Sequence, residues 1–178
     1  MLAKNIINRL KTKNSDTLEN CVKDRLAYLK NGGGGVSIIT LHEGVYETLE
    51  KIKKMGYFIV IVTSRENKSI VKKTVQYLKI EHFIGNIYSS SDYMRIKKKK
   101  FNDYVELKTH LYKLALKNNH SRIGQKKVIV IGNLKADIIA AKKLKLFSIA
   151  IKGTYRFDSG ISKLGTTVSN FNSILHYL

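Results

Sequence analysis

Two oxygen-bearing side chains follow an unbroken apolar run in the second half of the chain. Residues 128–131 are all β-branched, and they are followed by Gly132, Asn133 and, four residues later, Asp137. An apolar run without alternation predicts a parallel strand that is buried on both faces. Ligands of open α/β sheets bind beyond the carboxyl ends of such strands. Asn133 and Asp137 are therefore candidate site residues, and their oxygens suit a cation such as Mg²⁺.

Hydroxyl groups follow a second apolar run. Residues 59–62 read Ile-Val-Ile-Val and are followed by Thr63 and Ser64, just before a predicted helix. A hydroxyl beside the free N–H groups of a helix start can bind phosphate oxygens. A helix cap explains the same residue types equally well. The pattern leaves phosphate binding and a purely structural cap as two open interpretations.

Strands and helices alternate along the chain. Apolar and β-branched runs predict strands at residues 36–41, 57–62, 83–88, 127–131 and 147–151, and helical periodicity predicts helices at 17–30, 43–55, 67–78, 104–118, 136–144 and 170–178. This alternation predicts an α/β fold with a doubly wound parallel sheet, a Rossmann-type core. Glycines 32–35 indicate a hinge. We therefore predict a short helical N-terminal segment at residues 1–35 and an α/β core at residues 36–178.

Four segments, in this order, resemble the motifs of a known family. They are Thr63-Ser64 after a strand, Lys108-Thr109 in a predicted helix, Gly132-Asn133 with Asp137, and the strand with its glycine loop at residues 147–156. Together they resemble the haloacid dehalogenase (HAD)-like hydrolase superfamily, in its phosphoglycolate-phosphatase-like branch. The resemblance covers residues 41–178 and implies a phosphohydrolase fold.

The resemblance also implies a role for each matched residue. Thr63, Ser64 and Lys108 would bind the phosphoryl group, and Lys108 and Asp137 would belong to the catalytic set. Asp137 with Asn133 would hold Mg²⁺, although Asn133 stands where the family usually has an acid. Lysines 97–100 also fit the single-lysine motif. The implied substrate is a small phosphorylated metabolite.

The family's first motif, a strand that ends in Asp-x-Asp, has no match in this sequence. Its first Asp is the family's nucleophile and a Mg²⁺ ligand. The aspartates of this chain are Asp16, Asp24, Asp92, Asp103, Asp137 and Asp158, and no two of them are separated by a single residue. Because covalent catalysis needs a positioned nucleophile, the sequence predicts a HAD-like domain without turnover, a pseudoenzyme.

Two explanations of the missing motif stay open. In the first, the chain is a shortened member in which residues 1–35 resemble the family's helical cap, and a complete parent would be a Mg²⁺-dependent phosphomonoesterase. In the second, the domain has diverged, and residues 36–41 replace the lost strand and bring Thr40 and His42 near the former acid positions. An unreplaced central strand would leave unpaired backbone groups in the core, whereas residues 42–45 match the segment that follows the cap.

The net charge of +20 raises the alternative of a basic nucleic-acid-binding module. Most of the basic residues are lysines spread along the chain, and the dense run at residues 97–100 is predicted to be a loop. The tyrosines do not alternate with lysines as a base-stacking surface requires. We therefore expect incidental polyanion binding that weakens with salt.

The amino-acid composition limits the kinds of protein and of metal site that this chain can form. A single cysteine, Cys21, excludes a disulfide framework and a cysteine-rich zinc site. The five histidines show no metal-ligand spacing. No apolar run reaches the roughly 18 residues of a membrane span. These features predict a cytoplasmic protein with no membrane partner, and the basic residues 1–15 leave organelle targeting as the alternative.

Overall fold

A computed structural model gives the structure of the chain and describes residues 40–98, 101–123, 127–152 and 159–178. The chain divides into two compact units, residues 1–40 and residues 41–178. All the elements below belong to the second unit. The predicted helix at 17–30, the glycine hinge at 32–35 and most of the predicted strand at 36–41 lie outside the described residues. Thr40 and Leu41, the described end of that strand, are not in a strand.

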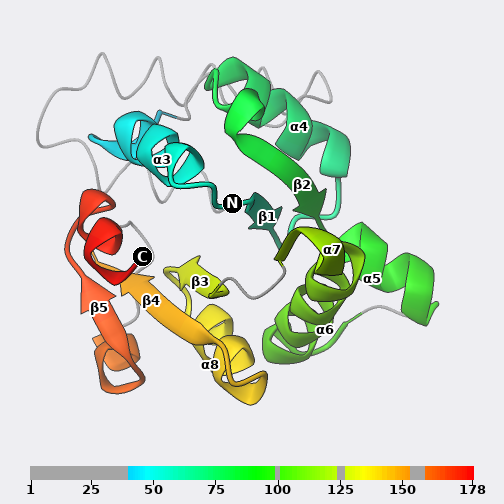
Figure 1. Cartoon of the computed structure of the whole chain (residues 1–178). Coiled ribbons are helices and arrows are strands. Elements are labelled where there is room, and N and C mark those ends of the chain that lie inside the picture. The colour runs from blue at the N-terminus through cyan, green and yellow to red at the C-terminus, as the bar shows by residue number, and fades with distance from the viewer. Residues whose placement is uncertain (1–39, 99–100, 124–126, 153–158) are drawn as a thin grey trace, which may run out of the picture. The chain divides into compact units, whose positions relative to one another are not determined.

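Helices and strands alternate through the second unit (Figure 1). In chain order the elements are α3 (Val45–Lys54), β1 (Ile59–Val62), α4 (Lys68–Tyr77), η2 (Glu81–Phe83), β2 (Ile84–Tyr88), α5 (Ser90–Lys97), α6 (Tyr104–Asn118), α7 (His120–Ile123), β3 (Ile129–Gly132), α8 (Lys135–Lys143), β4 (Phe147–Ile151), η3 (Ser159–Lys163), β5 (Thr166–Val168) and η4 (Asn172–Tyr177). The order confirms the α/β fold that the sequence predicts.

All the strand pairs are parallel. In one sheet β1 pairs with β2, with Ile61 opposite Ile87. In the other sheet β3 pairs with β4 and β4 pairs with β5, with Ile131 opposite Ile149. The parallel pairing agrees with the prediction, but the described strands form two sheets where a single sheet is expected. Within the described residues, no strand pairs with the second edge of β1 or of β3.

Among the described residues β1 and β3 are edge strands, and the burial of β1 agrees with this. All four residues of β1 are apolar and yet only half-buried, because β1 has one strand neighbour among the described residues. The central strand β4 has a neighbour on each side, and its residues Ser148, Ile149 and Ala150 are buried. A strand that is rich in Ile and Val and flanked on both sides is typical of a parallel sheet. β1 therefore has the sequence of a central strand, while the described residues give it a strand neighbour on one side.

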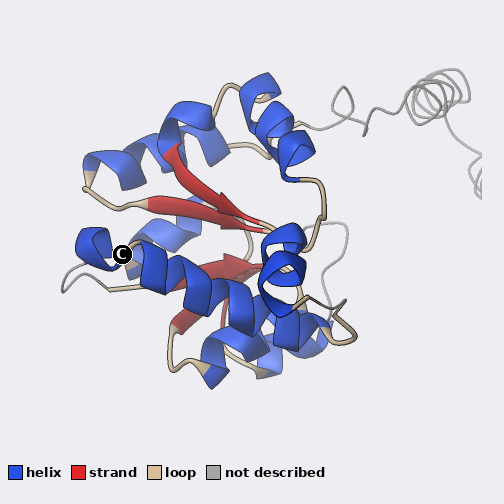
Figure 2. Cartoon of the chain, turned by 90° about the vertical axis from the view of Figure 1, so that its right-hand side faces the viewer, coloured by secondary structure: helices blue, strands red, loops and turns tan. Residues whose placement is uncertain are grey.

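The two edge strands run in the same direction, because their corresponding ends share partners. Near the amino ends, the Tyr57 hydroxyl donates to the Leu178 carbonyl at 3.0 Å and the Lys127 ammonium donates to the Tyr177 carbonyl at 2.9 Å. At the carboxyl ends, the Lys108 ammonium joins the last carbonyl of β1 to the acid in α8, the helix that follows β3. Both sheets therefore present their carboxyl ends to the same edge (Figure 2).

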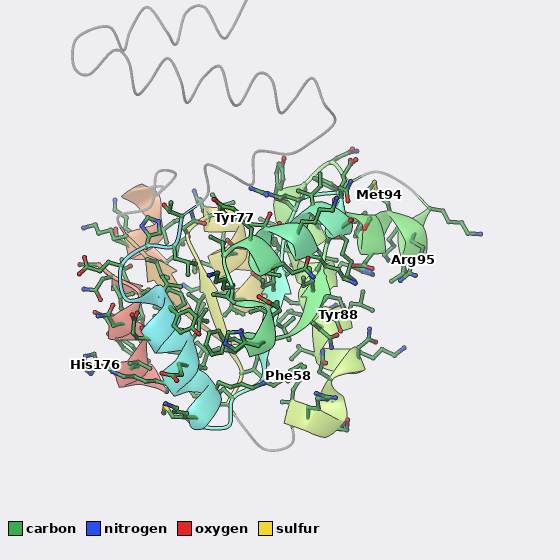
Figure 3. The ribbon with its side chains drawn as sticks, turned by 90° about the horizontal axis from the view of Figure 1, so that it is seen from above. Phe58, Tyr77, Tyr88, Met94, Arg95 and His176 are labelled. Carbon is green, nitrogen blue, oxygen red and sulfur yellow. The ribbon has the colours of Figure 1, made fainter. Side chains whose placement is uncertain are left out.

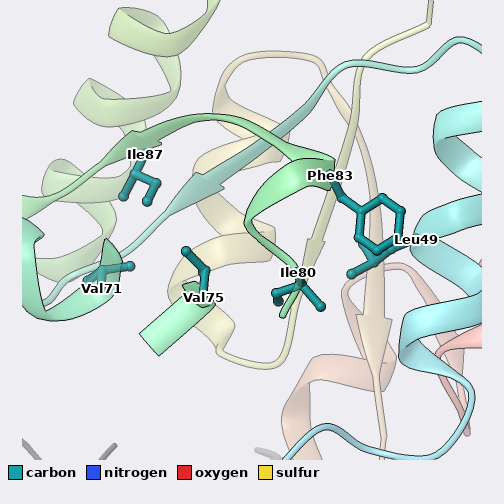
Figure 4. Packing of buried hydrophobic residues seen from close by; sticks show 6 residues of the cluster. All are labelled: Leu49, Val71, Val75, Ile80, Phe83 and Ile87. Carbon is teal, nitrogen blue, oxygen red and sulfur yellow. The ribbon is translucent and has the colours of Figure 1, made fainter. Parts of the chain in front are cut away.

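Two helices pack against both sheets from opposite faces. On one face, Leu49 of α3 packs in a cluster with Ile87 of β2, while Ile52 of the same helix packs with Ile149 of β4. The first cluster consists of Leu49, Val71, Val75, Ile80, Phe83 and Ile87 (Figure 4). On the other face, α6 contacts β2 through the cluster of Tyr88, Tyr93, Leu107 and Leu111, and β3 through the cluster of Tyr112, Val130, Ala140 and Ala141. α3 and α6 thereby hold the two sheets together.

The helix α5 was missed by the sequence prediction, which gave a loop there. A capping arrangement starts it, since the Asp92 carboxylate accepts from the Ser89 N–H at 2.9 Å. Lys97 is its last residue and Lys98 its cap, with φ of 53°, so the loop prediction for Lys97 is wrong. The closing element is also different, because η4 is a 3₁₀ helix and not the α-helix predicted at residues 170–178.

Candidate functional site

The predicted site residues line one cavity. Its volume is about 630 Å³, and it lies between β1 and β3 with α3 and α6 contributing the other walls. The residues at its carboxyl-end rim are Thr63, Ser64, Lys108, Asn133 and Asp137. Parallel strands with a common direction bring their carboxyl ends together, which is why residues more than 70 positions apart share this rim.

A buried ion pair forms the centre of the rim. The Lys108 ammonium lies 2.8 Å from the Asp137 carboxylate, and both side chains are 7% exposed. The same ammonium donates to the Val62 carbonyl at 2.9 Å. Lys108 is the fifth residue of α6, so it lies in the second helical turn and not at the helix start, as the sequence motif suggested. It connects the end of β1 to the start of α8.

Asp137 accepts hydrogen bonds at both of its oxygens. Oδ1 lies 2.8 Å from the Lys108 ammonium and accepts a hydrogen bond from the Tyr112 hydroxyl at 3.1 Å. Oδ2 takes the Leu134 N–H at 3.4 Å, in the first turn of α8. An acid in this first turn also interacts favourably with the positive end of the helix dipole. These contacts give both oxygens of the buried carboxylate hydrogen-bonding partners.

Tyr112 is a site residue that the sequence analysis missed. Burial raises its pKa well above the usual range, and the charge and hydrogen bond of Asp137 raise it further. The hydroxyl therefore stays protonated and donates to Asp137. Its spacing of four residues from Lys108 is the signal that was available, because residues i and i+4 of a helix lie on one face.

Thr63 and Ser64, which follow β1, form a turn before α4. The Thr63 Oγ1 accepts from the Arg65 N–H at 3.2 Å, and the Thr63 N–H donates to the Tyr88 carbonyl of β2 at 2.9 Å. The N–H groups at the start of α4 are taken by Asn67, whose side chain accepts from Ser69 and Ile70. Asn67 is the cap of α4, so the hydroxyls of Thr63 and Ser64 are not used as the cap.

The other sequence candidates lie elsewhere. His42 is exposed, and it is not among the described residues that line the cavity. Lys97 and Lys98 are exposed on and after α5 and do not line the cavity either, while residues 99 and 100 lie outside the described part. Among the lysines of this run that the structure describes, none has the burial or the acidic partner of Lys108.

Comparison with known families gives a match over most of the chain. The model of the haloacid dehalogenase-like hydrolases matches residues 3–151. The chain belongs to this family. No curated protein matches it. In the part of the HAD-like chain that the structure describes, no helix is long and apolar enough to cross a membrane.

Solved structures agree with the HAD-like fold. A haloacid dehalogenase-like hydrolase from Streptococcus pneumoniae aligns with a TM-score of 0.66 at 19% identity, covering 93% of this chain and 72% of that one. A Clostridium difficile protein proposed to be a phosphatase aligns at 0.65 and 25% identity, covering 100% and 77%. A Thermotoga maritima protein proposed to be a β-phosphoglucomutase aligns at 0.64 and 19% identity, covering 96% and 73%.

The residues of the rim do not by themselves form a magnesium site. A Mg²⁺ ion bound by Asp137 would compete with an ammonium group 2.8 Å away and with two further donors. Mg²⁺ prefers several oxygen ligands in octahedral geometry, and no group of three or more His, Cys, Asp or Glu gathers within the described residues. Mg²⁺ binding by Asp137 and Asn133 therefore stays a prediction, and no chemistry is assigned through it.

Gly132 allows Asp137 to approach the end of β3. A Cβ at this position would lie 2.6 Å from the Asp137 Cβ and 2.7 Å from its Oδ2. We expect Gly132→Ala to lower the free energy of unfolding by about 1–3 kcal/mol, since the carboxylate must shift out of its contacts. Urea denaturation measures this loss. The matched control is Gly165→Ala, where the nearest atoms lie at 3.9 Å; an equal loss in both variants would contradict the crowding at Gly132.

Proposed function

We propose that this HAD-like domain binds phosphate monoesters at the rim of the cavity and does not hydrolyse them on its own. The observation that carries the proposal is the buried Lys108 ammonium next to the Thr63-Ser64 turn, at the common carboxyl edge of both sheets. An ammonium and hydroxyl groups are suitable partners for phosphate oxygens. The proposed ligand is a small phosphorylated metabolite.

We propose that the domain does not hydrolyse phosphate esters because, among the described residues, its cavity offers no carboxylate that could act as the nucleophile. Asp137 is the one acidic residue among the described lining residues, and donors occupy both of its oxygens. A carboxylate nucleophile must offer an approachable oxygen to phosphorus. The printed sequence also lacks the Asp-x-Asp motif. A Mg²⁺-dependent phosphomonoesterase is the alternative that the family supports.

The binding test is thermal denaturation with inorganic phosphate, with chloride at equal ionic strength as the reference. A ligand that binds only the folded state stabilises it by about 2.7 kcal/mol at a hundredfold excess over Kd. We expect phosphate to raise Tm for the wild-type protein and for Thr109→Val, whose hydroxyl donates only to the Val105 carbonyl of its own helix. Thr63→Val should lose the shift, and an unchanged shift in this variant would contradict the proposed site.

The turnover test uses para-nitrophenyl phosphate with Mg²⁺. Wild type should release nitrophenol no faster than Thr63→Val. Mg²⁺-dependent hydrolysis that Asp137→Ala abolishes would overturn the inactive assignment and favour the phosphomonoesterase.

Polyanion binding stays a prediction from charge. The aromatic residues labelled in Figure 3, Phe58, Tyr77 and Tyr88, lie apart on the fold. Among the described residues, three cations already lie over rings within the chain. The distances to the ring centres are 5.6 Å for the Lys68 ammonium at Tyr88, 4.9 Å for the Arg122 guanidinium at Phe58 and 4.3 Å for the Lys127 ammonium at Phe147. These contacts give no specific support to a nucleic-acid-binding module.

A further inference from the structure

The proposed phosphate rim contains a negative charge of its own. The Asp137 carboxylate lies 2.8 Å from the Lys108 ammonium, and both side chains are only 7% exposed. A phosphate dianion that binds this ammonium therefore competes with a buried carboxylate for it. Two like charges in a poorly solvated place repel each other strongly. Phosphate binding at the rim therefore requires a second donor for the carboxylate when the ammonium turns to the ligand.

Tyr112 supplies a donor to the same carboxylate oxygen. Its hydroxyl donates to Asp137 Oδ1 at 3.1 Å, and Oδ1 is also the oxygen that the Lys108 ammonium contacts. Tyr112 and Lys108 are four residues apart on α6, so they approach the carboxylate from neighbouring turns of one helix. The Leu134 N–H serves the other oxygen, Oδ2, at 3.4 Å. Of these three donors, Tyr112 is the one that remains on Oδ1 when the ammonium moves.

The ring of Tyr112 is held in place, whereas the end of the Lys108 side chain can turn. Tyr112 is 7% exposed and packs with Val130 of β3 and with Ala140 and Ala141 of α8. Packing of this kind fixes the few torsions that position a tyrosine hydroxyl. A lysine ammonium ends a flexible four-carbon chain and can change partners without moving its helix. The hydroxyl can therefore stay on the carboxylate while the ammonium turns.

The Lys108 ammonium is anchored directly before the turn that would hold phosphate. It donates to the Val62 carbonyl at 2.9 Å, and Thr63 is the next residue of the chain. Thr63, Ser64 and Lys108 line the same cavity. A rotation at the end of the side chain can thus exchange Asp137 for a phosphate oxygen while the bond to Val62 is kept.

We infer that Tyr112 is a positioning residue for phosphate binding, whose hydroxyl holds Oδ1 of Asp137 when the Lys108 ammonium turns to the ligand. The inference rests on the proposed phosphate site and adds to it a residue that acts through Asp137. Hydrogen bonds to charged groups are stronger than those between neutral groups. Removal of this one hydroxyl should therefore be measurable in the phosphate affinity.

Isothermal titration calorimetry of the full chain with inorganic phosphate tests this role. Tyr112→Phe keeps the ring and removes only the hydroxyl, and we expect about tenfold weaker binding. Tyr104→Phe is the matched control and should bind as wild type does, because Tyr104 is on the same helix, is 54% exposed and is not among the residues that line the cavity. Unchanged affinity of Tyr112→Phe would overturn the inference and leave the phosphate site standing. A wild-type protein that binds no phosphate would overturn both.

The Asp137→Asn background shows whether Tyr112 acts through the carboxylate. The carboxamide has no charge for the hydroxyl to hold, so Tyr112→Phe should change the phosphate affinity by less than about twofold in this background. A loss that is equal in both backgrounds would show that Tyr112 acts on the ligand or through packing. That result would overturn the positioning role.

Tyr112→Leu separates the hydroxyl from the ring and does not depend on the folding of Asp137→Asn. Without the ring a gap remains against Val130, Ala140 and Ala141, so the free energy of unfolding should be lower than in Tyr112→Phe. The phosphate affinity should match that of Tyr112→Phe, because both variants lack the same hydroxyl. A further loss of affinity of about tenfold in Tyr112→Leu would assign the effect to ring packing and contradict the inference.

Discussion

Lys108→Met is expected to lower the free energy of unfolding by about 3–5 kcal/mol, because it leaves the Asp137 carboxylate buried without its cation. The side chain of Asp137 is 7% exposed, so bulk water compensates poorly for the loss of the ammonium that lies 2.8 Å away. The Val62 carbonyl loses its donor at the same time. A typical domain is stable by only about 5–15 kcal/mol, so this one change removes a large part of the total.

Urea denaturation followed by circular dichroism measures the loss. The matched control is Lys113→Met, which makes the same change at an exposed position on the same helix. We expect less than about 0.5 kcal/mol there. Similar losses in both variants would mean that the pair contributes through helix propensity or net charge and not through its burial.

The sequence predicted the fold well wherever a pattern is local. The apolar run of β3 and the polar residues after it follow from composition and position, and the 15-residue helix α6 was placed with its observed limits, Tyr104–Asn118. The helix α5 was missed because its sequence, Ser-Ser-Asp-Tyr-Met-Arg-Ile-Lys, ends in the first of four successive lysines, a run that suggests a loop. Its start depends on the contact between Asp92 and the Ser89 N–H, which is a matter of geometry.

The division of the described strands into two sheets could not be predicted from the strands themselves. β1 has the continuous Ile and Val pattern of a strand with neighbours on both sides, and sequence alone does not record which strand is adjacent to which. The contacts of the site residues could not be predicted from the sequence for the same reason. Lys108 was selected by its resemblance to a family motif, but its burial, its bond to the Val62 carbonyl and its contact with Asp137 depend on the packing of α6 against both sheets. The role of each rim residue in binding stays a prediction.

Adding Asp137→Asn to Lys108→Met is expected to restore much of the lost stability. Each single variant leaves one buried charge without its partner, whereas the double variant leaves none. The Asn carboxamide keeps an oxygen that can accept from the Tyr112 hydroxyl, which now contacts Asp137 at 3.1 Å. The losses should therefore be strongly non-additive, with a coupling of about 2–3 kcal/mol in the double-mutant cycle.

The double variant also separates folding from binding. With Lys108 replaced, the rim has no ammonium beside Thr63 and Ser64, so phosphate should no longer raise Tm even though the protein is folded. The measurement is the phosphate-dependent Tm shift of the double variant beside that of Lys113→Met, which should keep it. A double variant that is folded and still shows the full shift would remove Lys108 from the proposed phosphate site. Additive losses in the denaturation cycle would instead show that Lys108 and Asp137 stabilise the fold independently.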